Sequence, residues 1–560
     1  MEGQRMNAAL LGLIGLIAFS LAYRFYLKFL SQKLFGLEEL DAQGEQTPAH
    51  IMRDDVDYVP TKTSVLLGHH FSSIAGAAPI VGPAVAAIWG WLPAFLWIVL
   101  GVVFMGASHD FGALVLSMRH KAGSMAQVSE HVIGPRVRNL FLLIIFFLVW
   151  MVIAVFALVI ANLFIQFPSS VLPVNIEILV ALAIGFFVSR KNKSLVAPSI
   201  IAQILLWVFI YLGTISPISL GDHALMKWVI FLLIYSFIAS ILPVWTLLQP
   251  RDYINSHQLF IGLTLMILGL FIVQPEVVAP AINTRVDGAP PIFPFLFITI
   301  ACGAISGFHG LVSSGTTSKQ VATWKAAKSV GYGSMLGEGL LALVATLAVT
   351  TGFADRTAWH GHYGNWIMAN GLGAKIAAFV QGSGKFIAGL GIPEDISQTV
   401  IAVMIISFAA TSLDTACRIQ RYIIGELGDA FEVKPLKNRF LGSGIAVLSA
   451  FGLMMSADGG KGGLLIWPLF GATNQMLAGL TLTVISVFLL KMKRNALPYL
   501  IPAVFVLFIT SIGLFYNIKN FLHQENYMLM VLGGVLLSCQ VWVIFESFTA
   551  IRKYRVVSSR

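Results

Sequence analysis

Two adjacent ionisable residues, His109 and Asp110, stand within the apolar stretch 93–118. A charged side chain at the centre of a bilayer is costly, so ionisable residues at that depth usually have a function. Histidine titrates near neutrality, and a carboxyl group kept from water can titrate there too, so the two residues could relay a proton. Successive helix residues point about 100° apart, so we do not expect this pair to bond to each other. The alternative is a structural cap that holds a gate at one end of the helix.

A second group of candidate ligands lies in the segment "SGFHGLVSSGTTSKQ", Ser306–Gln320. Hydroxyl and carbonyl oxygens are hard ligands that suit a small cation such as Na⁺, whereas histidine suits a proton. Serine and threonine also bond back to their own helix without any ligand. A proton, a sodium ion and plain packing therefore stay open for this segment, and we favour the proton. The candidate ligands at its inner end are His309, Ser313, Ser314, Thr316 and Thr317.

Other ionisable residues also fall in or beside apolar stretches. Asp414 precedes Arg418 by one helical turn, a spacing at which opposite charges pair, so we expect a structural pair or a gate. Glu338 is flanked by glycines and has no partner that the sequence identifies. We expect His69 and His70 at a cytoplasmic mouth, where at least one is solvated, because adjacent histidines alone lack zinc-site spacing. The candidate ion-coupling residues are His109, Asp110, His309, Ser313, Ser314, Thr317 and Asp414.

The composition shows what kind of element must position these residues. Of the 560 residues, 57% are hydrophobic and only 11% are charged, against about 25% charged in soluble domains. Apolar runs of about 20 residues, the length that crosses a bilayer, recur along the chain. This composition predicts an all-α polytopic membrane protein. The net charge of +10 requires no nucleic acid as a partner, because Lys and Arg accumulate in cytoplasmic loops.

Hydropathy indicates about fifteen membrane spans, among them 292–313 and 437–455. Most of the 36 Lys and Arg residues fall in alternate loops if the N-terminus is outside and the C-terminus is cytoplasmic. The first apolar run, Ala8–Ala22, is followed by Arg24, Lys28 and Lys33, whereas a secretory signal carries its charges before the run, so we expect an uncleaved first helix. The region Thr357–Pro393 is half apolar, and we expect an interfacial helix or a re-entrant pair there.

One span-length segment, Gly68–Ala87, contains helix breakers. Pro79 and Pro83 each remove a backbone donor, so the helix is either kinked or interrupted. An interruption at membrane depth is tolerated only where protein or water pairs with the freed backbone groups. A second irregular segment, Leu233–Tyr253, contains Pro243 and runs in the opposite direction in the predicted topology. Two interrupted spans at corresponding positions of inverted halves are typical of secondary transporters.

This pattern predicts a core of five plus five inverted-repeat helices, like that of the leucine transporter LeuT, with extra helices around it. The interruptions would face a small-molecule substrate near the bilayer midplane. The candidate substrate-binding residues are Ser72, Ser73, Gly76, Ala77, Ser240, Trp245 and Asn474, of which the last could instead hold helices together. The predicted parts are an N-terminal extra helix and cytoplasmic loop at 1–64, a first repeat at 65–220, a second repeat at 221–430 and accessory helices at 431–560.

Six segments, in order along the chain, carry a more specific signal. They are "GHHFSSIAGAAPIVGPAVAAIWGW", "ASHDFGALVLSMRHK", "LPVWTLLQPRDYIN", "GFHGLVSSGTTSKQ", "FAATSLDTACRIQRY" and "IWPLFGATNQMLAGLTL". Together they resemble the carbon starvation protein A family, from about residue 65 to about residue 490. The resemblance implies a multi-pass carrier of the bacterial inner membrane, induced when carbon is scarce, that takes up short peptides or pyruvate with a cation gradient.

We therefore expect a secondary active transporter that works by cation-coupled alternating access, with H⁺ favoured over Na⁺ and no cofactor. A channel or nutrient sensor without coupled transport is the alternative, although a channel would show rings of like polar residues rather than scattered single ionisable groups. We do not expect an enzyme, because an enzyme would need a clustered nucleophile or metal set. The closest candidates, His109, Asp110 and Ser313, are not brought together by anything in the sequence.

The charge distribution yields a testable topology. We predict that the N-terminus faces the outside and that Arg560 faces the cytoplasm, because this orientation places most basic residues in cytoplasmic loops. Reporter fusions that are active on only one side of the membrane, placed at each end, measure this directly. Both ends on the same side would contradict an odd number of spans.

Overall fold

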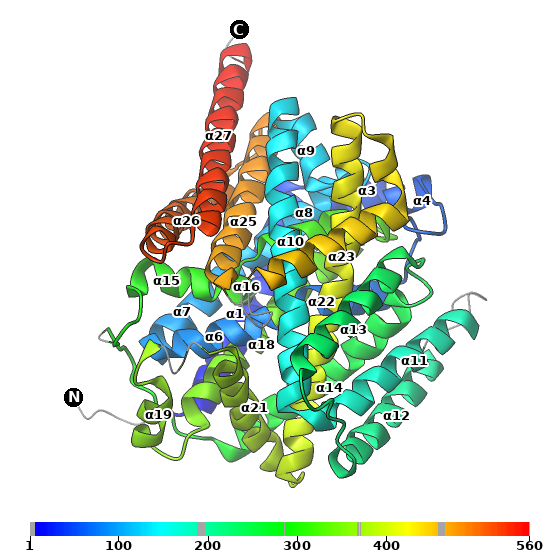
Figure 1. Ribbon diagram of the computed structural model, residues 1–560. Helices are drawn as coiled ribbons and strands as arrows, with labels where there is room; N and C mark the ends of the chain where they lie inside the picture. The colour runs from blue at the N-terminus through cyan, green and yellow to red at the C-terminus, as the bar shows by residue number, and fades with distance from the viewer. Residues whose placement is uncertain are drawn as a thin grey trace.

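The computed structural model describes residues 6–187, 196–284, 286–366, 369, 371–456 and 465–558. Every regular element in these residues is a helix, and the β-pairings among them are isolated bridges. Twelve of these helices are long and apolar enough to cross a membrane, or thirteen if one bent pair counts as a single span. The chain is an all-α polytopic membrane protein, as its composition predicts (Figure 1).

The long helices coincide with the apolar runs of the sequence. In chain order they are Ala8–Leu34, which starts as α1 (Ala8–Leu21), then Trp91–Arg119, made of α7 (Trp91–Gly101) and α8 (Ala107–Arg119), α10 (Pro135–Gln166), α11 (Val171–Phe187), α12 (Val196–Ile215), α13 (Ala224–Ile241), α14 (Leu248–Val273), α18 (Ser334–Thr351), α22 (Glu394–Ala430), α25 (Trp467–Lys491), α26 (Leu497–His523) and α27 (Tyr527–Ser558). Shorter helices flank them, namely α3 (Leu37–Ala42), α4 (Pro48–Ile51), α9 (Met125–Val132), α19 (Arg356–Tyr363), α21 (Leu372–Ala388) and α23 (Arg439–Met455).

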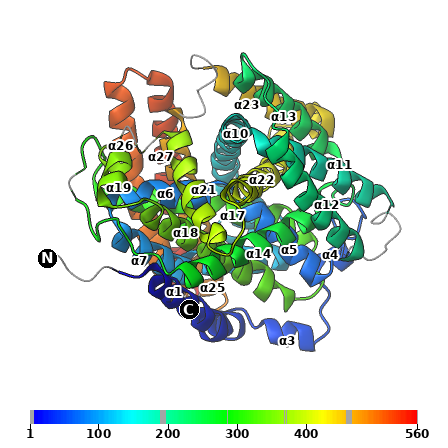
Figure 2. The same ribbon diagram turned by 90° about the horizontal axis from the view of Figure 1, so that it is seen from below.

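The centre of the bundle is the lengthwise packing of α10 against α22. Seen from below, the two helices lie side by side near the middle, with α11 and α12 at one edge and α26 and α27 at another (Figure 2). In the most apolar 18-residue stretch of α22, 100% of the residues are buried in the bundle. In the corresponding stretches of α12 and α27, only 33% of the residues are buried. A helix that is apolar all round belongs in a core, and an apolar helix that is mostly uncovered faces lipid. The bundle is therefore built around α10 and α22.

The first interrupted helix lies where the sequence predicts it. α5 (Thr63–Ile74) and α6 (Ala78–Ala86) are separated by residues 75–77 and are bent by 46°. Pro79 occupies the first turn of α6, where its missing N–H costs nothing because that group has no partner in the helix. The helix therefore restarts at this proline.

The second predicted interruption is in a different place. Residues 242–247, which include Pro243, form a link between α13 and α14, and each of these helices is long enough to span alone. Leu233–Tyr253 is therefore not one interrupted span, as we expected. Proline suits both of its positions here, because the link has no helical bond to lose and Pro250 falls in the first turn of α14.

The segment predicted as the span 292–313 holds the second interruption instead. It consists of three short helices, α15 (Ile292–Thr299), α16 (Ala301–Ala304) and α17 (Gly307–Gly315). Ile305 and Ser306 between α16 and α17 have extended backbone angles. No proline marks this position in the sequence, which explains why the periodicity of apolar residues suggested an unbroken helix.

The two interrupted helices cross each other in opposite directions. The first half of one packs on the second half of the other, because α5 contacts α17 and α6 contacts α16, while α18 runs beside both α5 and α6. Discontinuous helices in this antiparallel arrangement are the mark of an inverted-repeat transporter core. The structure does not mark the predicted boundaries of the repeats at 65–220 and 221–430, and these stay predictions.

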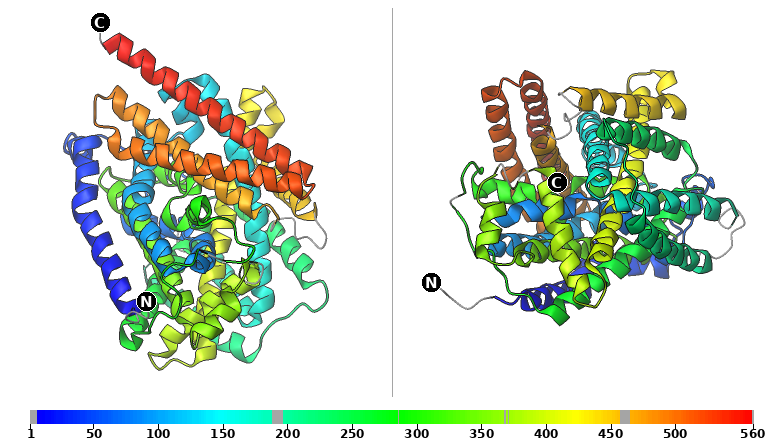
Figure 3. Two further views of the ribbon diagram at one scale, coloured as in Figure 1. Left: turned by 90° about the vertical axis from the view of Figure 1, so that its left-hand side faces the viewer. Right: turned by 60° about the horizontal axis from the view of Figure 1, so that its bottom comes forward.

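The remaining helices surround this core. α25, α26 and α27 pack on one another along one side, and α1 lies on another side (Figure 3). Of the expected spans, 437–455 is the 17-residue helix α23, and the region 357–393 contains α19 and α21, both shorter than a span. The orientation of the two termini and the odd number of spans stay predictions.

The close approach of α6 to the second interrupted helix gives a stability prediction. A Cβ atom on Gly82 would stand 2.3 Å from the backbone oxygen of Thr299, which cannot move aside cheaply. We expect Gly82→Ala to destabilise the protein by about 1–3 kcal/mol, the usual cost of overpacking. The control is Gly452→Ala in α23, where a Cβ meets nothing within 4 Å and alanine should be neutral or stabilising. Thermal unfolding of the purified variants measures the difference, and equal midpoints would contradict the packing.

Candidate ion-coupling and substrate site

Asp110 of α8 is the centre of a buried cluster of ionisable side chains. Its Oδ1 lies 2.8 Å from Nδ1 of His109, and its Oδ2 lies 3.0 Å from Nδ1 of His309 in α17. All three side chains are at most 1% exposed. The expectation that His109 and Asp110 do not bond to each other is wrong, because their side-chain torsions bring the two heads together despite the angle between adjacent positions.

Glu338 of α18 extends the cluster on the other side of His309. Its Oε2 lies 3.2 Å from Nε2 of His309, so the imidazole stands between two buried carboxylates. The carboxylate of Glu338 accepts no hydrogen bond from the described residues. Buried carboxylates and imidazoles this close titrate as one coupled system, not as separate groups. The cluster can therefore take up or release a proton as a unit, and it supplies the partner for Glu338 that the sequence did not reveal.

The hydroxyl groups proposed as sodium ligands are mostly engaged elsewhere. Ser314 donates to the carbonyl of Gly310 at 2.7 Å, and Thr316 donates to the carbonyl of Val312 at 3.0 Å, so both bond back to their own helix. Ser313 reaches the backbone oxygen of Asp110 at 3.5 Å. Thr317 contacts Nδ1 of His70 at 2.8 Å. These four side chains therefore make contacts within or between helices, and their oxygens do not surround one open site.

A second buried cluster surrounds Arg251 in the first turn of α14. Its guanidinium bonds to the carboxylate of Asp414 in α22 and to the hydroxyl of Tyr235 in α13, and Tyr235 also donates to Asp414 at 2.8 Å. The neighbouring Asp252 contacts Nδ1 of His69 at 2.5 Å. Arg251 is only 2% exposed, and its charge is paired with that of Asp414 inside the bundle.

The expected helical pair of Asp414 and Arg418 does not form. Asp414 pairs with Arg251, as described above, whereas Arg418 donates to the carbonyl of Ala239 at 3.2 Å and also to that of Leu242. Its Nη1 lies 3.5 Å from a carboxylate oxygen of Asp57. Asp414 and Arg418 each bond to distant residues because these partners satisfy charges that are out of water. A pair between the two along one helix face would leave other buried charged groups without partners.

His69 and His70 of α5 are buried next to two different elements. His69 contacts Asp252 of α14, and the adjacent His70 contacts Thr317, just after α17. Both are at most 1% exposed, so the expectation that one of them is solvated is wrong. Their Nε2 atoms are buried without a hydrogen-bond partner among the described residues. In native structures such atoms usually contact a water or another group, so these two nitrogens can bond to a buried water or to a ligand.

The predicted substrate residues of the first interrupted helix lie together at its break. Ser72 donates to the backbone oxygen of Asp252 at 3.2 Å, and the carbonyl of Ser73 accepts from Ser412 in α22 at 3.1 Å. The hydroxyl of Ser73 is buried and has no hydrogen-bond partner among the described residues. Gly76 approaches α10 and α22 so closely that a Cβ would meet Phe156 and Ser412. Ala77 precedes α6 at its N-terminus.

Two of the other predicted substrate residues, Asn474 and Ser240, hold helices together in the structure. Oδ1 of Asn474 in α25 accepts from the backbone N–H of Phe308 at 2.8 Å and from Ser306 at 3.2 Å, so it caps the restart of α17. Ser240 of α13 bonds to the hydroxyl of Ser443 in α23 at 2.9 Å. Trp245 lies in the link between α13 and α14. Roles for these three in binding stay predictions.

Several residues of the site escaped the sequence analysis. Tyr235 and Asp252 complete the Arg251 cluster, and Glu177 of α11 accepts a bond from Ser407 of α22 at 2.9 Å in a buried position. The one available signal was the pair Arg251–Asp252 directly after a proline, which resembles a loop as much as a helix start. A tyrosine or glutamate in an apolar run gives no sign of its partner.

Known proteins resemble this chain over most of its length. The family model described as carbon starvation protein CstA matches residues 7–359 and 362–513. A peptide transporter CstA of Bacillus subtilis is 32% identical over 95% of this chain and 94% of its own length. The pyruvate/proton symporter BtsT of Escherichia coli is 33% identical over 91% of this chain and 81% of its own length. These relatives are transporters, not enzymes.

Two solved structures are distantly similar. One is MhsT in complex with L-phenylalanine, with a TM-score of 0.48 and 11% identity, covering 80% of this chain and 98% of that one. The other is the Eremococcus coleocola manganese transporter in complex with an aromatic bis-isothiourea compound, with a TM-score of 0.49 and 12% identity, covering 90% of this chain and 99% of that one.

The Arg251 cluster gives a prediction about stability. Asp414→Asn leaves the buried guanidinium without its main counter-charge, which should cost about 3–5 kcal/mol. Replacing both partners, in Arg251→Met with Asp414→Leu, should recover much of that loss because no unpaired charge remains. The control is Asp55→Asn, which removes an exposed pair with Arg53 and should change stability little. Thermal unfolding in detergent compares the three, and a double variant no more stable than Asp414→Asn would contradict the pairing.

Proposed function

Because the chain belongs to the carbon starvation CstA family, we propose that it imports short peptides or pyruvate across the bacterial inner membrane, driven by protons. Its relatives include a peptide transporter and a pyruvate/proton symporter. Transport itself is the common property of these relatives. The substrate and the coupling ion are our proposal, and they are supported by the chemistry of the buried clusters.

The observation that carries proton coupling is the position of His309 between Asp110 and Glu338. Two carboxylates and an imidazole out of water cannot all hold their charges without partners, so the number of bound protons is sensitive to small changes in the surroundings. This arrangement favours H⁺ over Na⁺.

The interrupted helices connect the proton to movement. His309 belongs to α17, the second half of one interrupted helix, and His70 belongs to α5, the first half of the other. A half-helix that ends inside the protein can tilt without moving the rest of its span. Protonation that changes the charge between α8, α17 and α18 then shifts the balance between two arrangements of these halves. Proton and substrate are coupled because both act on that one equilibrium.

The break between α5 and α6 supports a carboxylate-bearing substrate. The N-terminus of α6 carries the positive end of the helix dipole, which attracts an anionic group. The unbonded hydroxyl of Ser73 lies just before this break. Pyruvate and short peptides share a carboxylate, so both can use such a site. We place Ser72, Ser73, Gly76 and Ala77 around it.

Uptake into proteoliposomes tests this function. Labelled pyruvate and dialanine are supplied under an imposed pH gradient or an imposed sodium gradient. A gradient of one pH unit can drive about tenfold accumulation of pyruvate if one proton accompanies each molecule. Accumulation under the pH gradient but not the sodium gradient is the expected result. Equilibration without accumulation under either gradient would indicate a channel instead.

The role of Asp110 is tested in the same vesicles. We expect Asp110→Asn, which mimics the protonated carboxyl permanently, to abolish proton-driven accumulation and to retain exchange of labelled for unlabelled substrate. Exchange needs no net movement of protons, so it separates lost coupling from lost binding or folding. Ser313→Ala with Thr317→Ala is the comparison, because it removes neutral oxygens and should retain proton-driven uptake. An Asp110→Asn protein that still concentrates pyruvate with protons alone would refute this role.

A further inference from the structure

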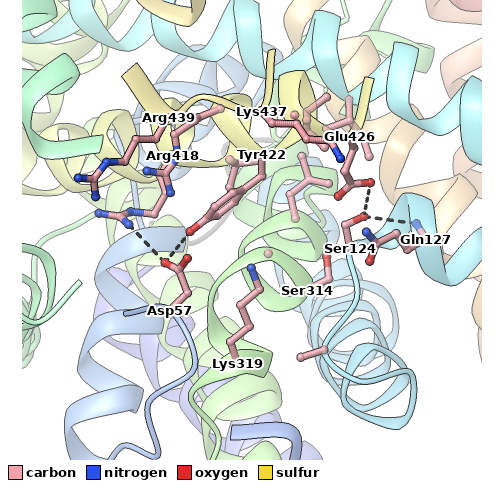
Figure 4. Close-up of a pocket in the computed structure, with 18 of the residues that line it drawn as sticks. Asp57, Ser124, Gln127, Ser314, Lys319, Arg418, Tyr422, Glu426, Lys437 and Arg439 are labelled. Atoms are coloured by element: carbon pink, nitrogen blue, oxygen red, sulfur yellow. Dashed lines mark hydrogen bonds and ion pairs between the residues drawn. The ribbon is translucent and has the colours of Figure 1, made fainter. Parts of the chain in front are cut away.

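A cavity of about 450 Å³ opens at the end of the bundle that we predict to be cytoplasmic. We call it the vestibule. Its volume is in the range of small-molecule pockets. Figure 4 shows Asp57, Arg418 and Tyr422 on one side of it, Glu426 with Ser124 on the other, and Lys319 between them. Its walls come from the chain before α5, the start of α9, the end of α17, the C-terminal half of α22 and the chain before α23.

The vestibule has an excess of positive charge. Five lysines and arginines line it, against three acids. Two of the acids are already engaged, because Asp429 pairs with Lys437 and Glu426 accepts from Ser124 at 3.1 Å. The cations are Lys319, Arg418, Arg421, Lys437 and Arg439.

The third acid, Asp57, shows how the vestibule holds a carboxylate. The hydroxyl of Tyr422 donates to its Oδ1 at 2.6 Å, and Nη1 of Arg418 lies 3.5 Å from the same oxygen. Lys319 stands over the rings of Tyr58 and Tyr422, with its nitrogen 5.5 Å and 4.3 Å from their centroids. It makes no ion pair with any carboxylate among the described residues. The vestibule thus holds the carboxylate of Asp57 beside the ammonium group of Lys319, which has no carboxylate partner among the described residues.

We propose that the vestibule binds a small carboxylate anion at Lys319, Arg418 and Tyr422, in competition with Asp57. The guanidinium of Arg418 and the hydroxyl of Tyr422 already donate to one carboxylate and can donate to another, and charged hydrogen bonds from arginine are strong. The ammonium group of Lys319 supplies a positive charge that favours the incoming anion over the carboxylate of Asp57. The inference rests on the proposed function, because pyruvate and peptides are carboxylates that must leave through this end.

The position of the vestibule connects this site to the buried cluster. Ser314 lies on its wall, and His309 lies one and a half turns earlier in the same helix, about 7.5 Å along the axis. On the other side, Asp57 precedes α5, which carries His69 and His70. A carboxylate that displaces Asp57 releases the chain leading into α5. Occupation of the vestibule therefore acts on the half-helix that moves in transport.

A cysteine placed in the vestibule reports its occupant without any transport. Gly425 lines the cavity, and a Cβ there meets nothing within 4 Å. We would introduce Gly425→Cys after replacing Cys302, Cys417 and Cys539 by alanine. The probe is the rate at which an anionic methanethiosulfonate reagent modifies the purified protein in detergent. Pyruvate and acetate should slow this reaction, and the methyl ester of pyruvate, which has no carboxylate, should not.

Charge variants locate the effect. Lys319→Gln should slow the anionic reagent about two- to fivefold, as expected for one partly solvated charge, and should weaken protection by pyruvate. Lys325→Gln, an equal charge change at an exposed residue outside the vestibule, should do neither. Asp57→Asn should strengthen protection by removing the competitor. Its control is Asp55→Asn, an exposed residue of the same loop that does not line the cavity.

The outcomes separate this inference from the proposed function. Protection by pyruvate and acetate that Lys319→Gln weakens and Lys325→Gln does not supports the site, whether the occupant in the cell is the substrate or another small acid. No protection, or equal protection by the methyl ester, overturns it even if uptake is normal. If the cysteine-free protein does not fold, the rise in thermal midpoint caused by pyruvate is compared for Lys319→Gln and Lys325→Gln, and equal rises overturn the site.

Discussion

The rule that every backbone polar group in hydrocarbon needs a partner controls this structure. Two of its helices stop and restart inside the bundle, and each restart requires donors and acceptors from elsewhere. At the first break the carbonyl of Ser73 receives a bond from Ser412 of α22. At the second, Asn474 of α25 bonds to Ser306 and to the backbone of Phe308. The breaks are therefore possible only where α22 and α25 enclose them, which is why they lie in the core of the bundle and not at its lipid face.

Buried charge follows the same rule and lies in the same region. Asp110 is paired with His109 of its own helix and with His309 of α17, and Arg251 of α14 is paired with Asp414 of α22. Pairs of this kind do little for stability by themselves, because the cost of removing both charges from water offsets their attraction. Their value is sensitivity: a proton added or removed changes the balance of a whole cluster. Such groups beside two broken helices are suited to linking ion binding to movement.

The half-helices α5 and α17 bring these parts together. α17 carries His309 of the buried cluster, and its last turn forms part of the vestibule wall through Ser314. α5 carries His69 and His70, and the chain that leads into it is held at the vestibule by Asp57. α17 thus carries a residue of the buried cluster and a residue of the vestibule wall, and α5 is connected to the vestibule through the chain that precedes it. A change at either place is transmitted along a short rigid element, which is the simplest form of coupling between two sites.

What the sequence determined by itself is local: the apolar runs, the membrane setting and the first break, where Pro79 prevents a continuous helix. It also indicated which buried residues were ionisable, but not their partners. The second break at residues 305–306 has no proline, because the extended backbone there is held by Asn474, 168 residues further along the chain. Asp414 pairs with Arg251, 163 residues away, and not with the arginine one turn along its own helix. The periodicity of a helix predicts contacts only between residues that are near in the sequence. Buried charges and backbone groups need a partner because they are out of water, and the packing of the bundle decides which residue that partner is.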